Sequence, residues 1–544
     1  MICILHGYLL EGSGSNLWTR SIAQSLCRDG QDVHLVCQEN HPEIYDFIAE
    51  VRLYRTDGSV ETLLERDTPY EGRCVMHKPR LGKTLPVYVW DRYEEFPDPV
   101  PMVELPDAVI EEYLERNVRV VRRVVAENGI TAMHANHAVL MSVVAERVGT
   151  DAGIPFAIMP HGSAIEYAVK KDARFHRYAS EAFSAAARIF VIGDEMRERV
   201  TTVFPGVDGL MEKLRGLNLG VDTALFEPVE HDDRPASVKG LVRRVREMER
   251  GKTRQQSDEL LGDLSGSLTR EELTALIGST SKYDAKRPDA DVEEKLEAVA
   301  WRTDDVLLFV GRLIASKGIQ SVLAALPTIL AARPDTRLVV VGHGPLREPM
   351  EALAHALGTG NRALARHIVE WGTALEGSTP RPLREVQAYW EELKKEGRLE
   401  EYFRVAEERM TRDRVIFTGY LTHSELRYLF PLADVAIFPS VVAEAGPLVF
   451  LEALASGCFP LGTYFAGMAA SIDSVADGLP DEDAEWMKLD PDPEQTVKDI
   501  ARNVPGALSL GGRHRTELRR IAVERYDWRS VGRRMVEELE GAVR

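Results

Sequence analysis

The 544-residue sequence is poor in cysteine, and the few cysteines follow no pattern. There are five, at Cys3, Cys27, Cys37, Cys74 and Cys458. An odd, scattered set without metal-ligand spacing argues against a disulfide framework and against a structural zinc site. We therefore expect reduced, buried thiols and a cytoplasmic protein.

An excess of basic residues and long apolar runs are also missing. Lys and Arg number 67 against 86 Asp and Glu, which gives a net charge of −19. This balance argues against non-specific nucleic-acid binding and gives no support to a membrane-surface role. No apolar run approaches the ~18 residues of a membrane span. The opening MICILHGY lacks the basic n-region of a signal peptide. We expect no nucleic-acid partner, no membrane span and no signal peptide.

What the sequence does contain is an alternation of strand and helix patterns. Apolar runs predict strands at 1–6, 33–37, 129–134, 155–159, 189–192, 306–310, 337–341, 415–419 and 433–438. This alternation predicts an α/β fold with doubly wound, Rossmann-like domains. The polar, charged segments 230–300 and 352–412 are expected to be helical insertions. A capping box, Thr269 with Glu272, indicates a helix within the first.

Residues 40–115 are less regular. Two strands are predicted, at 51–54 and 85–90, with an irregular connection between them. Asp91, Arg92 and Tyr93 follow the second strand and are candidates for a lid over a ligand. A surface hairpin is the alternative interpretation.

The most informative stretch is FPSVVAEAGPLVFLEALASGCFP, residues 438–460. It indicates a strand end, a loop and a helix that starts at Gly446-Pro447. Proline is preorganised for the first helical position, and glycine lets a ligand approach the backbone. The N–H groups of the helix N-terminus favour an anion, and Glu444 and Glu452 flank it with hydroxyl-binding carboxylates. A nucleotide sugar fits that description, although a turn with two solvated glutamates is the alternative.

Two cations follow the predicted strand 306–310, in the run Gly311-Arg312-Leu-Ile-Ala-Ser-Lys317. Arginine can bind a diphosphate bidentately, and lysine acts as a point charge. Gly311 would allow close approach of the backbone. A solvated charged loop is the alternative.

Three further strand ends carry candidate ligand groups. After the first strand, Gly12-x-Gly14 begins a dinucleotide fingerprint, but Leu17 stands at the third glycine position. Glu39 at the second strand end could bind a ribose, which leaves an NAD-dependent dehydrogenase open. His161 ends the strand 155–159, where open α/β sheets bind ligands, although a single histidine is more often structural.

Seven pieces, in this order, resemble the family 4 retaining glycosyltransferases of GT-B fold. They are the glycine loop after strand one, His161-Gly162, NLGVD at 218–222, FVGRLIASKGI at 309–319, VVVGHGPLR at 339–347, VIFTGYLTHSEL at 415–426 and PSVVAEAGPLVFLEALASG at 439–457. They span roughly half of the chain, and residues 40–115, 230–300 and 352–412 lie outside the resemblance. Ala445 departs from the family, which commonly has an aromatic residue before that glycine.

The resemblance implies two Rossmann-like domains that face a cleft. Residues 1–228 would form the acceptor-side domain, with a C-terminal helix at 526–544 packing back on it. A charged helical insertion, 229–300, would follow. Residues 301–525 would form the nucleotide-sugar-binding domain, with the second insertion inside it.

The resemblance also implies roles for single residues. Arg312 and Lys317 would grip the diphosphate, and Glu452 would bind the ribose. Glu444 would lie near the hexose and His161 would contact the sugar. Backbone positions that would approach the donor are Gly14, Gly311, Gly446, Pro447 and Leu448.

The function so implied is retaining transfer of a hexose from a nucleotide sugar, with UDP-glucose favoured, to a hydroxyl of a sugar or small-molecule acceptor. The cations would stabilise the leaving diphosphate, and the sequence has no DxD motif after a strand, so we expect neither metal nor cofactor. A non-catalytic GT-B nucleotide-sugar-binding protein and a sugar-nucleotide epimerase of the same fold stay open. The two insertions are candidate contact surfaces for an oligomer.

Overall fold

The side chains of strand β1 (Ile2–Leu5) alternate between two hydrophobic cores, one on each face of the strand. Ile2 and Ile4 pack with Trp18 in one core, and Cys3 and Leu5 lie in the other. A strand buried on both faces is typical of a parallel sheet covered by helices on each side. This computed structural model describes residues 1–11, 13–88, 98–280, 286–442, 446 and 448–542.

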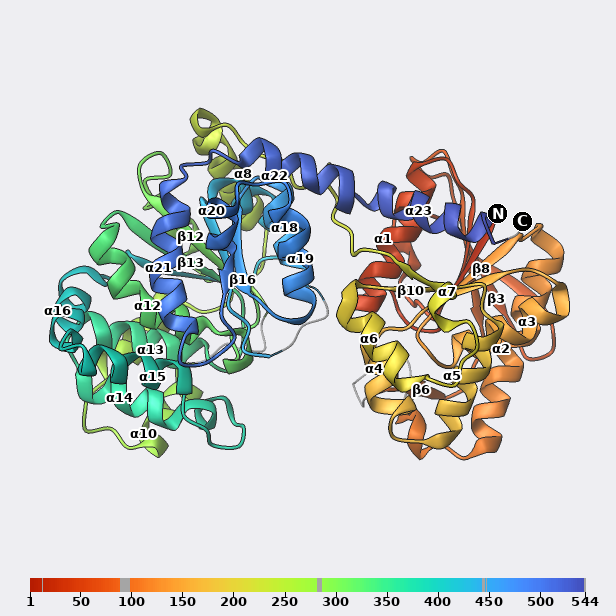
Figure 1. Cartoon of the computed structure of the whole chain (residues 1–544), viewed down its shortest axis with the longest axis horizontal. Helices are drawn as coiled ribbons and strands as arrows, with labels where there is room; N and C mark the ends of the chain where they lie inside the picture. The colour runs from red at the N-terminus through yellow and green to blue at the C-terminus, as the bar shows by residue number, and fades with distance from the viewer. Residues whose placement is uncertain (12, 89–97, 281–285, 443–445, 447, 543–544) are drawn as a thin grey trace. The chain divides into compact units, whose positions relative to one another are not determined.

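The first of two units comprises Met1–Gly220 and Arg525–Arg544 (Figure 1). Its sheet has the order β11-β10-β9-β8-β1-β2-β5-β3-β4, and only the β3–β4 pair is antiparallel. The bounds are β2 Val33–Val36, β3 Ile48–Tyr54, β4 Val60–Glu65, β5 Cys74–Pro79, β8 Ala132–Asn136, β9 Phe156–Met159, β10 Arg188–Val191 and β11 Leu214–Gly216. Strand order reverses between β1 and β8, the place where open α/β sheets bind ligands.

Helices cover both faces of this sheet. They are α1 Gly14–Arg28, α2 Asp107–Asn128, α3 Met141–Ala152, α4 Gly162–Ala164, α5 Ala173–Ala185, α6 Gly193–Val203, α7 Leu210–Lys213 and α23 Trp528–Glu540. Figure 1 shows the blue C-terminal helix α23 lying along the red α1. Met535 packs with Ile22 and Leu26 in their shared core. The C-terminal helix therefore belongs to the first unit.

Residues 40–115 contain more strands than the sequence indicated. β3 covers the predicted strand 51–54, but β4 and the fully inserted β5 were not predicted. The predicted strand 85–90 corresponds to β6 (Thr84–Val87), which pairs with β7 (Asp98–Pro101) in a separate two-stranded sheet. Asp91, Arg92 and Tyr93 lie outside the described residues.

The second unit comprises Val221–Glu524 and contains a six-stranded, all-parallel sheet. Its order is β14-β13-β12-β15-β16-β17. The bounds are β12 Asp305–Val310, β13 Thr336–Val341, β14 Val415–Gly419, β15 Val435–Phe438, β16 Phe459–Thr463 and β17 Lys488–Leu489. This is the strand order of the Rossmann fold, with its switch point between β12 and β15.

The helices of the second unit include both polar segments. They are α8 Arg234–Arg246, α9 Arg254–Gly262, α10 Arg270–Thr280, α11 Val292–Glu297, α12 Ile319–Ala332, α13 Arg347–Gly358, α14 Arg362–Trp371, α15 Arg384–Lys395, α16 Leu399–Arg409, α17 His423–Leu429, α18 Leu448–Ala455, α19 Ala466–Ala476, α20 Asp481–Ala484, α21 Thr496–Ser509 and α22 Arg515–Ile521. No helix among the described residues has the length and hydropathy needed to cross a bilayer.

The first polar segment is joined to helix α13 by buried charges. Lys252 pairs with Glu348 at 3.2 Å, and Asp289 pairs with Arg347 at 2.8 Å, all at side chains less than one tenth exposed. Residues 229–300 therefore belong to the same compact unit as the strands that follow. The predicted boundary at residue 228 lies inside this second unit.

Candidate functional site

The switch point of the second sheet brings two loops together. Val441 N–H donates to the Ser316 carbonyl at 2.9 Å, and Ser440 Oγ–H donates to the same oxygen at 3.1 Å. A Cβ added to Gly318 would lie 1.9 Å from the Pro439 carbonyl oxygen, so only glycine fits there. The loop after β12 and the loop after β15 are thus fixed side by side.

The two predicted cations lie on the first of these loops. Lys317 ends a short 3-10 turn, which is held by a 2.9 Å hydrogen bond from Ala315 N–H to the Glu376 carboxylate. Arg312 is exposed, and it forms no ion pair within the part of the chain that the structure describes. The loop therefore presents positive charge at the carboxyl edge of the sheet.

In this loop, close contacts between backbone segments require glycine at two positions of the turn after β13. A Cβ on Gly342 would meet the Gly311 carbonyl oxygen at 1.8 Å, and one on Gly344 would meet the Leu313 carbonyl oxygen at 2.3 Å. At Gly311 itself an added Cβ would meet only the Phe309 ring, at 3.6 Å. The glycine turn after β13 is what lets the Arg312 loop pass.

Glu452 lies on α18 and is 5% exposed. Its Oε1 is 2.5 Å from Nδ1 of His423, the first residue of α17. Its Oε2 has no hydrogen-bond partner among the described residues. A buried carboxylate oxygen without a donor is costly. A ligand hydroxyl would supply that donor, as the predicted role of Glu452 requires.

His423 was not singled out from the sequence, although the capping box Thr422–Glu425 marks its place. Two predicted residues, Glu444 and Pro447, lie outside the described residues. Gly446 is described, and Leu448 is the first residue of α18. Val441, at the start of the loop that leads to α18, is hydrogen-bonded to the turn that carries Lys317.

The switch point of the first sheet carries His161. The Nε2–H group of His161 donates to Asn136 Oδ1 at 3.0 Å. Asn136 Nδ2 in turn donates to Thr19 Oγ1 at 2.8 Å. His6 contacts Thr19 through Nδ1 at 3.1 Å and donates from Nε2 to Asn16 Oδ1 at 2.9 Å. These bonds orient His161 and leave its Nδ1 with a lone pair that can accept a hydrogen bond from a hydroxyl group.

Burial keeps this cluster neutral. It lowers the pKa of His161 to about 3, and the pKa of His6 and of His134 to about 4. Neutral imidazoles hydrogen-bond hydroxyl groups without adding charge. The cluster therefore suits a polyhydroxyl ligand.

His137 completes the cluster and was missed. It is 2% exposed, and neither ring nitrogen has a partner among the described residues. Its ring lies 4.8 Å from those of His161 and Tyr88, centroid to centroid. The sequence signal was present, because His6, His137 and His161 each follow the end of a strand of one sheet.

Gly14 and Glu39 belong to the two predicted roles of the glycine loop, and Glu39 tests whether the loop could be that of a dehydrogenase. Gly14 begins α1, and a Cβ added there would meet nothing within 4 Å. The Glu39 carboxylate accepts from the N–H groups of Leu10, Asn40 and His41, each at 2.9 Å. Its oxygens are engaged by the protein's own backbone, which argues against the ribose role that a dehydrogenase requires.

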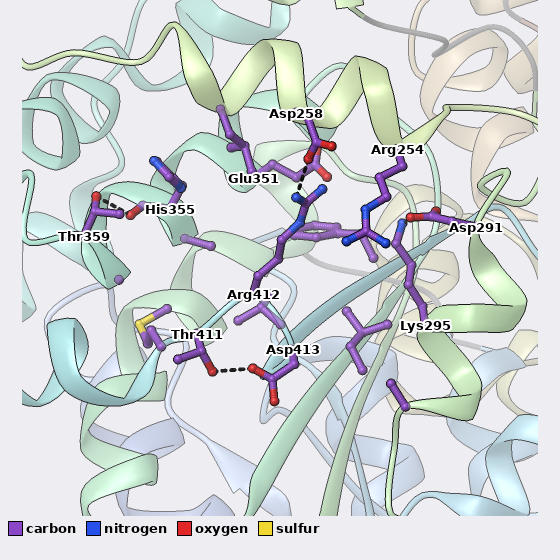
Figure 2. Close-up of a pocket in the computed structure, with 18 of the residues that line it drawn as sticks. Arg254, Asp258, Asp291, Lys295, Glu351, His355, Thr359, Thr411, Arg412 and Asp413 are labelled. Carbon is purple, nitrogen blue, oxygen red and sulfur yellow. Dashed lines mark hydrogen bonds and ion pairs between the residues drawn. The ribbon is translucent and has the colours of Figure 1, made fainter.

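A cavity of about 740 Å³ lies elsewhere in the second unit, between α9, α11 and α13 and the start of β14 (Figure 2). Figure 2 shows an ion pair between Arg412 and Asp258, and Arg254 forms another with Glu294 at 2.6 Å. Glu351 is paired with Lys252 at 2.5 Å. Because its charges pair with one another, this cavity carries no evident chemistry, and the switch points remain the candidate sites.

Two family models match the chain. The one described as "Glycosyl transferases group 1" matches residues 291–365 and 395–487, and the "Glycosyl transferase 4-like domain" matches residues 13–209. Together they cover about two thirds of the sequence. They extend into segments that were expected to lie outside the resemblance, and leave 210–290 and 366–394 unmatched.

Curated relatives match part of the chain. An uncharacterized glycosyltransferase of Methanocaldococcus jannaschii is 24% identical over 237 residues, 43% of this chain and 44% of that protein. A GDP-mannose-dependent alpha-(1-6)-phosphatidylinositol monomannoside mannosyltransferase of Mycolicibacterium smegmatis is 25% identical over 267 residues, 47% of this chain and 54% of that protein. The chain spans about half the length of the curated relatives it matches.

Among solved structures, that of Anabaena HepE in complex with UDP is similar over 99% of both chains, with a TM-score of 0.50 and 13% identity. This similarity is one of fold. The two doubly wound units are those of the GT-B architecture, which confirms the predicted fold class.

Proposed function

The chain belongs to the family 4 glycosyltransferases, and we propose that it transfers a hexose from a nucleoside diphosphate sugar to a hydroxyl of a sugar or small-molecule acceptor, with retention of the anomeric configuration. The observation that carries this proposal is the second switch point. There the Lys317 turn follows β12 and the loop after β15 leads to α18, whose Glu452 has an oxygen without a hydrogen-bond partner in the part of the chain that the structure describes.

The donor's diphosphate would bind between the Lys317 turn and the N-terminus of α18. Arg312 would contact a phosphate oxygen, and the N–H groups at the start of α18 would donate to the same diphosphate. Glu452 Oε2 would accept a hydrogen bond from a ribose hydroxyl. Glu444 would lie near the hexose.

These groups can act on the bond between the anomeric carbon and the phosphate oxygen. As that bond breaks, negative charge grows on the diphosphate and an oxocarbenium-like centre forms at the sugar. Arg312, Lys317 and the helix N-terminus would stabilise the leaving group. The acceptor oxygen would attack from the same face and pass its proton to the departing phosphate. No metal is required for this scheme.

The donor base and hexose follow from weaker arguments. HepE was solved with UDP, and the mycobacterial relative is named for GDP-mannose. We favour a UDP-glucose-like donor, with GDP-mannose as the second candidate. His161 would contact the sugar, because its neutral ring can accept a hydrogen bond from a hydroxyl group through Nδ1.

A donor-by-acceptor screen tests the proposal. UDP- and GDP-sugars are incubated with sugar and small-molecule acceptors, products are found by mass spectrometry, and NMR assigns the anomeric configuration. We expect transfer with retention, also in excess chelator. An inverted product would contradict the retaining assignment, and a strict metal requirement would contradict the metal-independent scheme.

A further inference from the structure

The segment Lys286–Asp289 belongs to residues 210–290, which neither family model matches, yet it lies beside the carboxyl end of β14, a strand of the second sheet. Tyr420 N–H donates to the Arg287 carbonyl at 3.0 Å, and Asp289 N–H donates to the Thr418 carbonyl at 2.8 Å. Pro288 and Gly419 form an isolated antiparallel bridge. The segment thus borders the carboxyl end of β14.

This strand end lies where the nucleoside of the proposed donor would extend. Glu452 lies on α18, and its carboxylate reaches His423 at the start of α17, directly after β14. A ribose bound by Glu452 would therefore lie on the β14 side of the diphosphate. The nucleobase, one step further from the diphosphate, would reach Tyr420 and the segment beside it.

Lys286 supplies a donor group at this place. It lines a cavity of about 30 Å³ together with His343 and Tyr420, whose rings are 4.9 Å apart, centroid to centroid. A cavity of that size holds about two waters, so a base would lie against its mouth and not inside it. Lys286 is exposed and has a φ of 43°, an unusual conformation for a residue other than glycine.

His343 connects the cavity that Lys286 lines to the loop that carries Arg312. The pKa of His343 is lowered by burial, then by the charges of Lys286 and Arg312. His343 also joins the two loops, because Leu313 N–H donates to its carbonyl at 2.8 Å. Lys286 therefore lines the same cavity as a residue that is hydrogen-bonded to the Arg312 loop.

We propose that the segment Lys286–Asp289 forms one wall of the nucleobase subsite and that Lys286 selects bases that present a carbonyl oxygen, uracil or guanine, over adenine. An ammonium group donates hydrogen bonds and accepts none, so it favours an oxo group and disfavours the amino group of adenine. This inference rests on the proposed function, since it assumes that a nucleoside diphosphate binds at the second switch point.

Titration calorimetry of the full chain tests the inference. The ligands are UDP, GDP, ADP and inorganic pyrophosphate. The variants are Lys286→Ala, Lys286→Arg and a control, Lys239→Ala, an exposed lysine on α8 of the same unmatched region. We expect Lys286→Ala to lower the affinity for UDP or GDP by about tenfold and the affinity for pyrophosphate by less than about threefold. Lys286→Arg should keep most of the affinity, and Lys239→Ala should bind as the wild type does.

Three results would overturn the inference. Equal weakening of pyrophosphate would make Lys286 part of the diphosphate site. Unchanged affinities in Lys286→Ala would remove it from the donor site while leaving the proposed function intact. A wild-type chain that binds none of the three nucleoside diphosphates would contradict the proposed function and this inference together.

Discussion

At the scale of single residues, the loop after β12 presents two cations in different settings. Lys317 is partly buried on a turn that other loops hold in place, whereas Arg312 is exposed at the sheet edge. A pre-positioned cation contributes to catalysis because it needs no reorganisation when charge develops. We therefore expect both positions to matter for turnover more than for folding.

We predict that Lys317→Ala and Arg312→Ala each lower turnover by at least ~100-fold, the order expected for losing one charge-stabilising donor. Circular dichroism should show both variants folded. The measurement is the rate of transfer from the best donor of the screen. Wild-type-like turnover in either variant would remove that residue from the site.

Glu452 allows a separate prediction about binding. Glu452→Gln keeps the shape of the side chain but replaces a charged acceptor with a neutral amide. We expect the nucleoside diphosphate to bind about tenfold more weakly, since hydrogen bonds to charged groups are the stronger ones. Pyrophosphate, which has no ribose, should bind unchanged. The matched control is Glu400→Gln, an exposed glutamate on α16. A loss of pyrophosphate binding would contradict the ribose role.

At the scale of elements, the site depends on how closely two loops approach each other. Gly318 has a φ of 79°, and its missing Cβ makes room for the Pro439 carbonyl. Gly318→Ala should push the loops apart and lower the free energy of unfolding by about 2 kcal/mol or more. Turnover should fall as well. Gly278→Ala, on α10 with nothing within 4 Å of the added Cβ, is the control. Equal stability of the two variants in urea would show that the close approach is unimportant.

The sequence predicted the elements better than their tertiary neighbours. Apolar runs located β12 to β15 because these strands are short and apolar, and they end at glycine or, for β15, at Pro439. β5 was missed because His77, Lys78 and Pro79 interrupt its apolar character, and its burial comes from the strands on either side. The role of Gly342 could not be predicted, because its requirement arises only where the Gly311 carbonyl passes.

At the scale of the whole molecule, the histidines of the first unit set a limit on its acid stability. Burial lowers the pKa of His6 and His134 to about 4, and that of His137 well below its usual value. Above pH 6.5 these imidazoles are neutral whether the chain is folded or unfolded. Below pH 6.5 the unfolded chain takes up protons, whereas His6 and His134 in the folded chain stay neutral down to about pH 4. The free energy of unfolding therefore falls as the pH is lowered across that window.

In this window each fully buried histidine should lower the free energy of unfolding by up to about 1.4 kcal/mol for each unit by which the pH falls. We predict that the urea midpoint of the chain is constant from pH 8 to 7 and drops between pH 6.5 and 4.5. His134→Leu should have a shallower drop, and His231→Gln, at an exposed residue, should follow the wild type. A midpoint independent of pH across the window would contradict the buried, neutral state.

The central claim is that the β12–β15 switch point binds a nucleoside diphosphate. Titration of the wild-type chain with UDP, GDP and NAD tests it most directly. The account predicts saturable binding of UDP or GDP, lost in the double variant Lys317→Ala with Glu452→Gln, and no binding of NAD. Binding of NAD, or binding of UDP that the double variant retains in full, would contradict it.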